Sequence, residues 1–171
     1  SALLSVYFSA LTAYAIHAYN FRFKNLAFTI IMVIMMVPTQ VSALGFVDQM
    51  SRMRLMNSFI PLIVPSIASP VVFFFIKQYM DSVLPIELVE AARIDGCSKF
   101  QAFYKIILPL SLPGILATGI STFLAGWDEL MIASVLTTTA TYQTIPVGIR
   151  LFIGNMQNRY DLTMAASVVT T

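Results

Sequence analysis

Charged side chains and cysteine are scarce in this sequence. Charged residues make up 11% of the 171 residues, whereas a soluble domain usually carries about 25%. The net charge of +2 is too small to indicate a nucleic-acid partner. The single cysteine, Cys97, excludes an internal disulfide framework. Hydrophobic residues make up 58% of the chain and its mean hydropathy is +0.81, so the composition is that of a membrane protein, with the lipid bilayer as its surroundings.

Patterns that would support catalysis or nucleotide binding are also missing from the sequence. It shows no paired nucleophile and base and no zinc-ligand spacing. It also lacks a glycine-rich loop followed by Lys-Ser or Lys-Thr, the pattern that cradles ATP phosphates. The single histidine, His17, lies in an apolar run and is expected to be a packing residue. We therefore predict no catalytic residue, no metal site and no cofactor, which argues against an intramembrane enzyme.

Long runs without charge predict the membrane spans, because crossing the hydrocarbon core takes about 20 apolar residues. We expect spans over about residues 1–21, 25–47, 55–76 and 106–136, with a last, truncated span over residues 162–171. The fold class is then all-α, a polytopic transmembrane helix bundle. Residues 1–171 are expected to form a single transmembrane domain that is an internal piece of a longer protein.

The connections between these spans alternate between two sides of the membrane. One side collects the basic residues Arg22, Lys24, Lys77, Arg93, Lys99 and Lys105. The other side collects Arg52, Arg54, Arg150 and Arg159. Because cytoplasmic connections carry an excess of Lys and Arg, the first side is predicted to be cytoplasmic.

A charged island at residues 82–105 separates two spans on the predicted cytoplasmic side. Pro85 suits the first turn of a helix, where its missing N–H is not needed. Gly96 suits the position after a helix end, where a left-handed backbone is favoured. Ser98 and Gln101 have the spacing of a capping box at the start of a second helix. The island is therefore expected to be two short helices joined by a sharp turn.

Two alanines, Ala91 and Ala92, are unusual choices for a surface helix. Small side chains let another backbone approach closely, as happens when a helix lies in a groove of a partner. The alternative is an ordinary amphipathic linker at the membrane surface. The physical pattern alone leaves both interpretations open.

The island resembles a known motif. Glu90-Ala91-Ala92, Gly96 and the stretch Ile106 to Pro109 are similar to the EAA motif of permease subunits of binding-protein-dependent ABC importers. A fuller string is close to the carbohydrate-uptake branch, the maltose- and glycerol-phosphate-type permeases; it comprises residues 90–96 (Glu-Ala-Ala-Arg-Ile-Asp-Gly), Phe103, residues 107–110 (Ile-Leu-Pro-Leu) and Pro113. Residues 127–130 (Trp-Asp-Glu-Leu) resemble that family's Trp-Asn-Glu-Phe stretch, and residues 144–148 and 165–167 resemble segments that flank its last external loop.

The resemblance implies a specific fold and role. The fold is the helix bundle of type I ABC importer permeases in a bacterial-type plasma (inner) membrane, crossed several times. The island is then a cytoplasmic coupling helix in a cleft of an ATP-binding subunit, and the permease hydrolyses nothing itself. The implied coupling residues are Glu90, Ala91, Ala92, Asp95 and Gly96.

The resemblance also implies partners and a class of solute. Besides cytoplasmic ATP-binding subunits, it implies a second homologous permease subunit. An extracytoplasmic solute-binding protein would dock near residues 48–56 and 137–160. The transported solute would be a sugar or an oligosaccharide.

Trp127, Asp128 and Glu129 are the candidate residues of a substrate pathway. Ionised groups at membrane depth are costly and often mark a pathway or a partner. Alternatively, the three residues lie near the outer interface in a structural role, with Trp127 as an anchor. The sequence departs from the family's stretch here, with Asp128 in place of Asn. The alternative function is an ion- or proton-coupled secondary transporter that uses Asp128 or Glu129.

Overall fold

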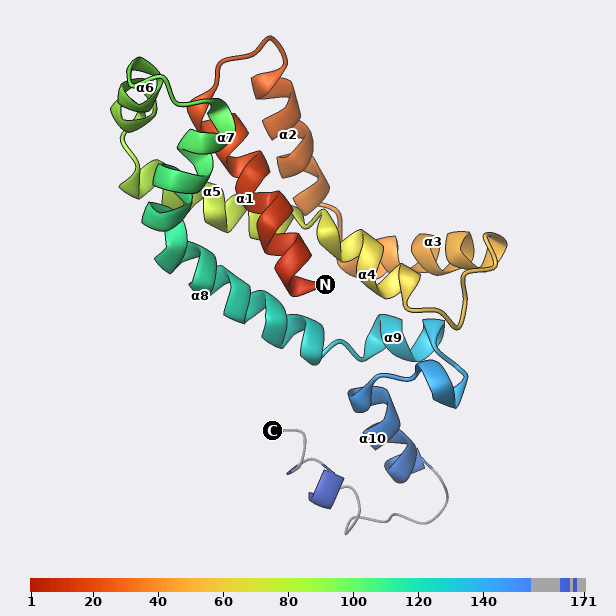
Figure 1. The fold of residues 1–171 in the computed structure, drawn as a ribbon. Coiled ribbons are helices and arrows are strands. Elements are labelled where there is room, and N and C mark those ends of the chain that lie inside the picture. The colour runs from red at the N-terminus through yellow and green to blue at the C-terminus, as the bar shows by residue number, and fades with distance from the viewer. Residues whose placement is uncertain (155–163, 167, 169–171) are drawn as a thin grey trace. The chain divides into compact units, whose positions relative to one another are not determined.

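The computed structural model describes residues 1–154, 164–166 and 168, and every regular element in this part of the chain is a helix (Figure 1). In chain order the elements are α1 (Ala2–Ala18), α2 (Lys24–Met35), α3 (Thr39–Arg52), α4 (Ile60–Ile67), α5 (Pro70–Val83), α6 (Ile86–Ile94), α7 (Lys99–Ala102), the π-helical turn η1 (Phe103–Ile107), α8 (Leu108–Trp127), α9 (Met131–Leu136), the 3₁₀ turn η2 (Ala140–Tyr142) and α10 (Ile145–Gly154). The all-α prediction is confirmed for the described residues.

Contacts divide the chain into two compact units. One unit comprises residues 1–38 and 64–124, and the other comprises residues 39–63 and 125–171. The expectation that residues 1–171 act as one domain stays a prediction.

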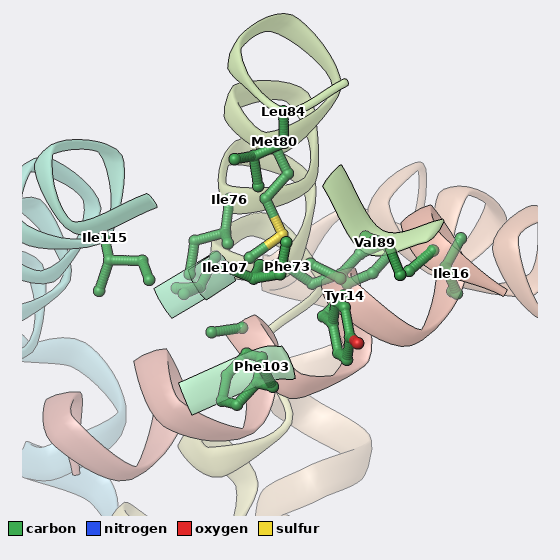
Figure 2. Packing of buried hydrophobic residues seen from close by; sticks show 14 residues of the cluster. Tyr14, Ile16, Phe73, Ile76, Met80, Leu84, Val89, Phe103, Ile107 and Ile115 are labelled. Atoms are coloured by element: carbon green, nitrogen blue, oxygen red, sulfur yellow. The ribbon is translucent and has the colours of Figure 1, made fainter. Parts of the chain in front are cut away.

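The first unit is built on α1 and α5, which pack along each other. Its core includes the buried side chains of Tyr14, Phe73, Ile76 and Met80 (Figure 2). Helix α2 packs against α5, while α6 and η1 pack against α1. Phe103 of η1 is fully buried in the same core, so the predicted island is part of the packed structure.

Helix α5 begins at a strong start signal. Ser69 is its N-cap residue, and the Ser69 hydroxyl accepts a hydrogen bond from the backbone N–H of Val72. Pro70 occupies the first helical position, where a missing N–H costs nothing. These two residues fix the start of a helix that contributes Phe73, Ile76 and Met80 to the first unit's core.

The expected span over residues 25–47 is not one continuous helix. Helix α2 ends at Met35 and α3 begins at Thr39. Pro38 lies in the break, and proline both lacks an N–H and disfavours helical backbone at the preceding residue, Val37. The proline therefore ends α2 well before the charge-free run ends.

The expected span over residues 106–136 is displaced toward the N-terminus. The helix that carries it runs from Lys99 to Trp127 over 29 residues, and α9 is a separate short helix. Within this helix, at the junction of η1 and α8, the Leu108 N–H bonds to the carbonyl of Phe103, five residues earlier. This wide turn precedes Pro109, which cannot donate a backbone hydrogen bond, so a bulge of this kind accommodates it. The second helix of the island is thereby continuous with the following span.

Two helical stretches in the described part of the chain are long and apolar enough to cross a membrane: Ile60–Val83 and Lys99–Trp127. Helices α2 and α3 would supply a third if they form one bent span. Helix α1 is apolar but has only 17 residues, slightly fewer than the roughly 20 that a perpendicular crossing needs. The expected last span, residues 162–171, falls mostly outside the described residues.

Candidate coupling site

The turn of the island is a helix ending with left-handed geometry at Gly96. Helix α6 ends at Ile94, and Gly96 follows with φ +78°. The Cys97 N–H bonds to the carbonyl of Ala92 at 2.9 Å, and the Gly96 N–H bonds to the carbonyl of Arg93 at 3.0 Å. These two bonds form a Schellman motif, which satisfies carbonyls at the helix end. The role predicted for Gly96 in the turn is confirmed.

The second helix of the island starts with the predicted capping box. The Ser98 hydroxyl accepts a hydrogen bond from the Gln101 N–H at 3.3 Å, and the Gln101 side chain accepts one from the Ser98 N–H at 2.8 Å. Pro85 differs slightly from expectation, since it is the N-cap residue and α6 begins one residue later, at Ile86. The two caps fix both helices on either side of the Gly96 turn.

Helix α6 has one face on its own chain and one face exposed. Val89 and Ala92 are 1% and 2% exposed and pack toward the core. Glu90, Ala91 and Asp95 are exposed. Of the two alanines predicted to face a partner, Ala92 therefore faces inward, because its position three residues after Val89 puts both on the buried side.

Ile94 is a surface residue that the sequence analysis missed. It is an apolar residue with 87% exposure, at the last position of α6. The signal was available, because Ile94 follows Ala92 by two positions, about 200° around a helix from the buried face. An exposed apolar side chain beside Ala91 extends the candidate partner-binding face.

Charge is distributed unevenly on the island. Glu87, Glu90 and Asp95 form no ion pair within the described residues, and all three are exposed. The basic side chains of Arg93 and Lys99 both lie near the ring of Tyr19, the residue that follows α1. The exposed face of α6 therefore presents carboxylates without a partner from the described part of the chain.

A polar cluster joins α1 and α5 in the first unit. His17 Nδ1 lies 2.8 Å from Asp81 Oδ1, and the other carboxylate oxygen of Asp81 pairs with Lys77. Lys77 Nζ also lies 5.0 Å from the centroid of the Phe28 ring, on α2. His17 is mostly buried, as expected for a packing residue, but its hydrogen-bonding contact with Asp81 was not predicted. The contact connects residues 64 positions apart and has no local sequence signal.

The residues proposed for a substrate pathway lie at the break between α8 and α9. Trp127 ends α8, and Asp128 and Glu129 are exposed. A carboxylate oxygen of Glu129 accepts a hydrogen bond from the backbone N–H of Ile132 at 3.0 Å. A carboxylate at this position also complements the helix dipole, so Glu129 has a structural role at the start of α9.

A second polar cluster, missed by the sequence analysis, closes a loop in the other unit. Asn57 Oδ1 accepts hydrogen bonds from the backbone N–H groups of Thr138 and Thr139 at 2.8 and 2.9 Å, and from the Thr138 hydroxyl at 3.0 Å. The Asn57 N–H bonds to the carbonyl of Leu136 at 2.8 Å. Asn57 has φ +57°, a conformation that asparagine tolerates better than most residues. The hydrogen bonds join residues 53–59 to residues 136–139.

Metal chemistry has no candidate among the described residues, where no group of three His, Cys, Asp or Glu side chains could hold an ion.

A family model, described as the binding-protein-dependent transport system inner membrane component, matches residues 5–171. The chain belongs to this family. The match confirms the resemblance seen in the EAA-like motif, and the description agrees with the predicted inner-membrane location.

Curated relatives have names that refer to sugars and related solutes. The chain is 34% identical to the arabinooligosaccharides transport system permease protein AraQ of Halalkalibacterium halodurans over 168 residues, which are 98% of this chain and 60% of that protein. It is 31% identical to the sulfoquinovosyl glycerol transport system permease protein SmoH of Agrobacterium fabrum over 171 residues, 99% of this chain and 60% of the relative.

A third relative is the sn-glycerol-3-phosphate transport system permease protein UgpE of Yersinia pestis. It is 34% identical over 164 residues, 95% of this chain and 58% of that protein. The chain thus spans about three fifths of the length of the curated relatives it matches.

Proposed function

We propose that this chain is part of the permease subunit of an ATP-driven importer for a sugar or an oligosaccharide. Membership of the binding-protein-dependent family supports an importer subunit. The solute class is supported by relatives named for arabinooligosaccharides and sulfoquinovosyl glycerol. The chain itself would carry no enzyme activity, because ATP would be bound and hydrolysed by a partner.

The exposed face of α6 is proposed to bind a cytoplasmic ATP-binding subunit. The observation that carries this proposal is the exposure of one face of α6 while its other face is buried in its own chain. The Gly96 turn at the end of α6 and the capping box at the start of α7 hold the helix in this orientation. The exposed face offers Glu90, Ala91, Ile94 and Asp95. A cleft that matches it would supply a basic side chain for the carboxylates and an apolar wall for Ile94.

Coupling then follows from the continuity of the backbone. ATP-driven closure of the partner subunits would displace α6 and the Gly96 turn. Helix α7 continues through η1 into α8 as one helix from Lys99 to Trp127, so the displacement reaches the span directly. Alternating access would result from this helix moving relative to others.

The remaining partners are proposed from the family. A second homologous permease subunit would complete the pathway, and an extracytoplasmic solute-binding protein would dock near residues 48–56 and 137–160. The hydrogen bonds of Asn57 support the docking site of the solute-binding protein, since they hold residues 53–59 against residues 136–139. Trp127, Asp128 and Glu129 are proposed to lie along the solute pathway.

Uptake into proteoliposomes tests the proposal. The full-length permease, reconstituted with its partner permease, ATP-binding subunits and solute-binding protein, should import radiolabelled sugar only with ATP and binding protein present. A panel containing arabinotriose, maltotriose and glycerol 3-phosphate tests the solute class. Uptake that follows a proton or sodium gradient without ATP would instead support the secondary transporter that uses Asp128 or Glu129.

A further inference from the structure

Tyr19, at the end of α1, contacts both helices of the island. It follows the last residue of α1 and has an extended backbone (φ −122°, ψ 141°). Cζ of Arg93 lies 4.6 Å from the centroid of the Tyr19 ring, and Nζ of Lys99 lies 5.0 Å from it. Arg93 belongs to the last turn of α6 and Lys99 is the first residue of α7. One aromatic ring therefore contacts the chain on both sides of the Gly96 turn.

Tyr14 holds the Tyr19 ring in place from inside the unit. The two hydroxyl oxygens are 2.8 Å apart, and the rings meet edge to face with centroids 5.4 Å apart. The Tyr14 hydroxyl donates a hydrogen bond to the Lys99 carbonyl at 3.3 Å, so it accepts a hydrogen bond from the Tyr19 hydroxyl. Tyr14 is 5% exposed, and its ring lies 5.3 Å from that of Phe103 (Figure 2). The pair joins α1 to α6, α7 and η1.

These contacts leave the proposed partner-binding face free. Arg93 and Lys99 are held by the aromatic ring through cation–π attraction, and neither forms an ion pair with an island carboxylate in the described residues. Glu90 and Asp95 remain available to a basic partner. The contact between the island and α1 can therefore persist while the partner is bound.

We propose that Tyr19 is a positioning residue that transmits the displacement of the island to α1; this inference rests on the proposed coupling function. Helix α8 is covalently continuous with α7 and must follow it. Helix α1 has no such continuity, because α1 ends at Ala18 and α6 begins at Ile86. Its movement with the island requires side-chain contacts. Besides the packing of α6 and η1 against α1, the Tyr19 ring contacts both α6 and α7.

Spin-label distances across this contact test the inference in the complete, membrane-reconstituted importer. Labels are attached to Thr12→Cys on α1 and Ile86→Cys on α6, both exposed positions, in a background with Cys97→Ser. With Tyr19 present, we expect one narrow distance that is the same with and without a non-hydrolysable ATP analogue. Tyr19→Ala should add a second distance when the analogue binds, because the packing of α6 and η1 on α1 that remains lacks the ring contacts to Arg93 and Lys99.

Two matched variants separate the ring from general effects. Tyr19→Phe retains the aromatic face and should behave like the unsubstituted protein. Phe23→Ala removes a similar cation–π contact, from Arg22 at 5.7 Å, that does not involve the island, and should also leave the distance unchanged. If Tyr19→Ala fails to assemble, the double variant Arg93→Gln with Lys99→Gln removes both cations from an intact ring and should give the second distance.

The outcomes distinguish the two proposals. A nucleotide-dependent change between α1 and α6 in the unsubstituted complex would overturn the role of Tyr19. The same narrow distance in both the Tyr19→Ala and the double variant would also overturn it. Failure of the full-length permease to assemble with ATP-binding subunits would instead reject the coupling function on which the inference rests.

Discussion

The aromatic ring of Tyr79 on α5 lies directly against the backbone of Gly114 on α8. A methyl group at Gly114 would lie 2.3 Å from Cγ of Tyr79 and 2.5 Å from its Cδ1, closer than side-chain carbon atoms approach in proteins. The contact is at the base of the ring, which cannot swing away as a flexible chain end could. Glycine is therefore required at residue 114 for this packing.

Gly114→Ala should lower the stability of the permease complex by roughly 1–3 kcal/mol, the range for overpacking a filled core. Gly119→Ala is the matched control on the same helix, since its methyl group would meet Val6 at an ordinary 3.7 Å. Thermal unfolding of the detergent-solubilised complex measures both. Equal melting temperatures for the two variants would show that Tyr79 can move aside.

Gly96→Val should uncouple ATP hydrolysis from transport because it strains the turn of the island. No atom lies within 4 Å of a Cβ at this position, so the cost comes from the left-handed backbone and amounts to about 1–2 kcal/mol. Gly96→Asn should retain most coupling, since asparagine tolerates positive φ. Solute transported per ATP hydrolysed is the measurement. Equal ratios for the valine and asparagine variants would contradict this role.

Asp81→Asn should destabilise the first unit more than Asp48→Asn destabilises the second. Asp81 pairs with His17 and Lys77, whose side chains are 10% and 16% exposed, while Asp81 itself is 36% exposed. Losing a hydrogen bond to a charged group costs roughly 1.5–3 kcal/mol, and solvent screening at Asp81 places the expected cost at the lower end. Asp48 pairs with Arg52 on an open helix surface, with side chains 62% and 78% exposed, where such a pair contributes about 0.3–0.5 kcal/mol.

Melting temperatures of the two variants at neutral pH compare the contributions of Asp81 and Asp48 to stability. The arrangement predicts a clear decrease for Asp81→Asn and almost none for Asp48→Asn. The reverse order would show that the pairing between α1 and α5 contributes little to the fold.

Asn57→Ala should loosen the loop that Asn57 holds through its side chain. The substitution removes an acceptor of three hydrogen bonds and places alanine at positive φ, for a combined cost of roughly 1–3 kcal/mol. Asn57→Gly removes the backbone strain but does not restore the hydrogen bonds, so its loss of stability should lie between those of the alanine variant and the unsubstituted protein. Protease cleavage within residues 53–59 measures the effect, and equal cleavage of all three proteins would refute it.

Local signals in the sequence predicted the island well. Gly96, Ser98 and Gln101 act within a few residues of one another, so the Schellman turn and the capping box follow from composition and spacing. The spans were predicted less accurately, because charge-free runs show where a helix can cross but not where it breaks. Pro38 ends a helix inside one such run. In another, η1 joins α7 to α8, so the helix begins at Lys99 and not near residue 106 as predicted.

Contacts between distant residues had no counterpart in the sequence pattern. The pairing of Tyr19 with Arg93, of His17 with Asp81, and of Asn57 with Thr138 depends on which helices and loops lie together. The inward orientation of Ala92 was available from helical spacing relative to Val89. It was missed because a pair of small residues suggested a partner for both.

Cross-linking from the exposed alanine of α6 tests the central claim most directly. A cysteine at Ala91, in the assembled importer with Cys97→Ser, should form an adduct with an ATP-binding subunit, and ATP should change its yield. A cysteine at Ala92, which is 2% exposed, should react much less. If residue 91 is labelled by a thiol reagent added from the cytoplasmic side and yet forms no adduct with the ATP-binding subunit, α6 is not the coupling helix.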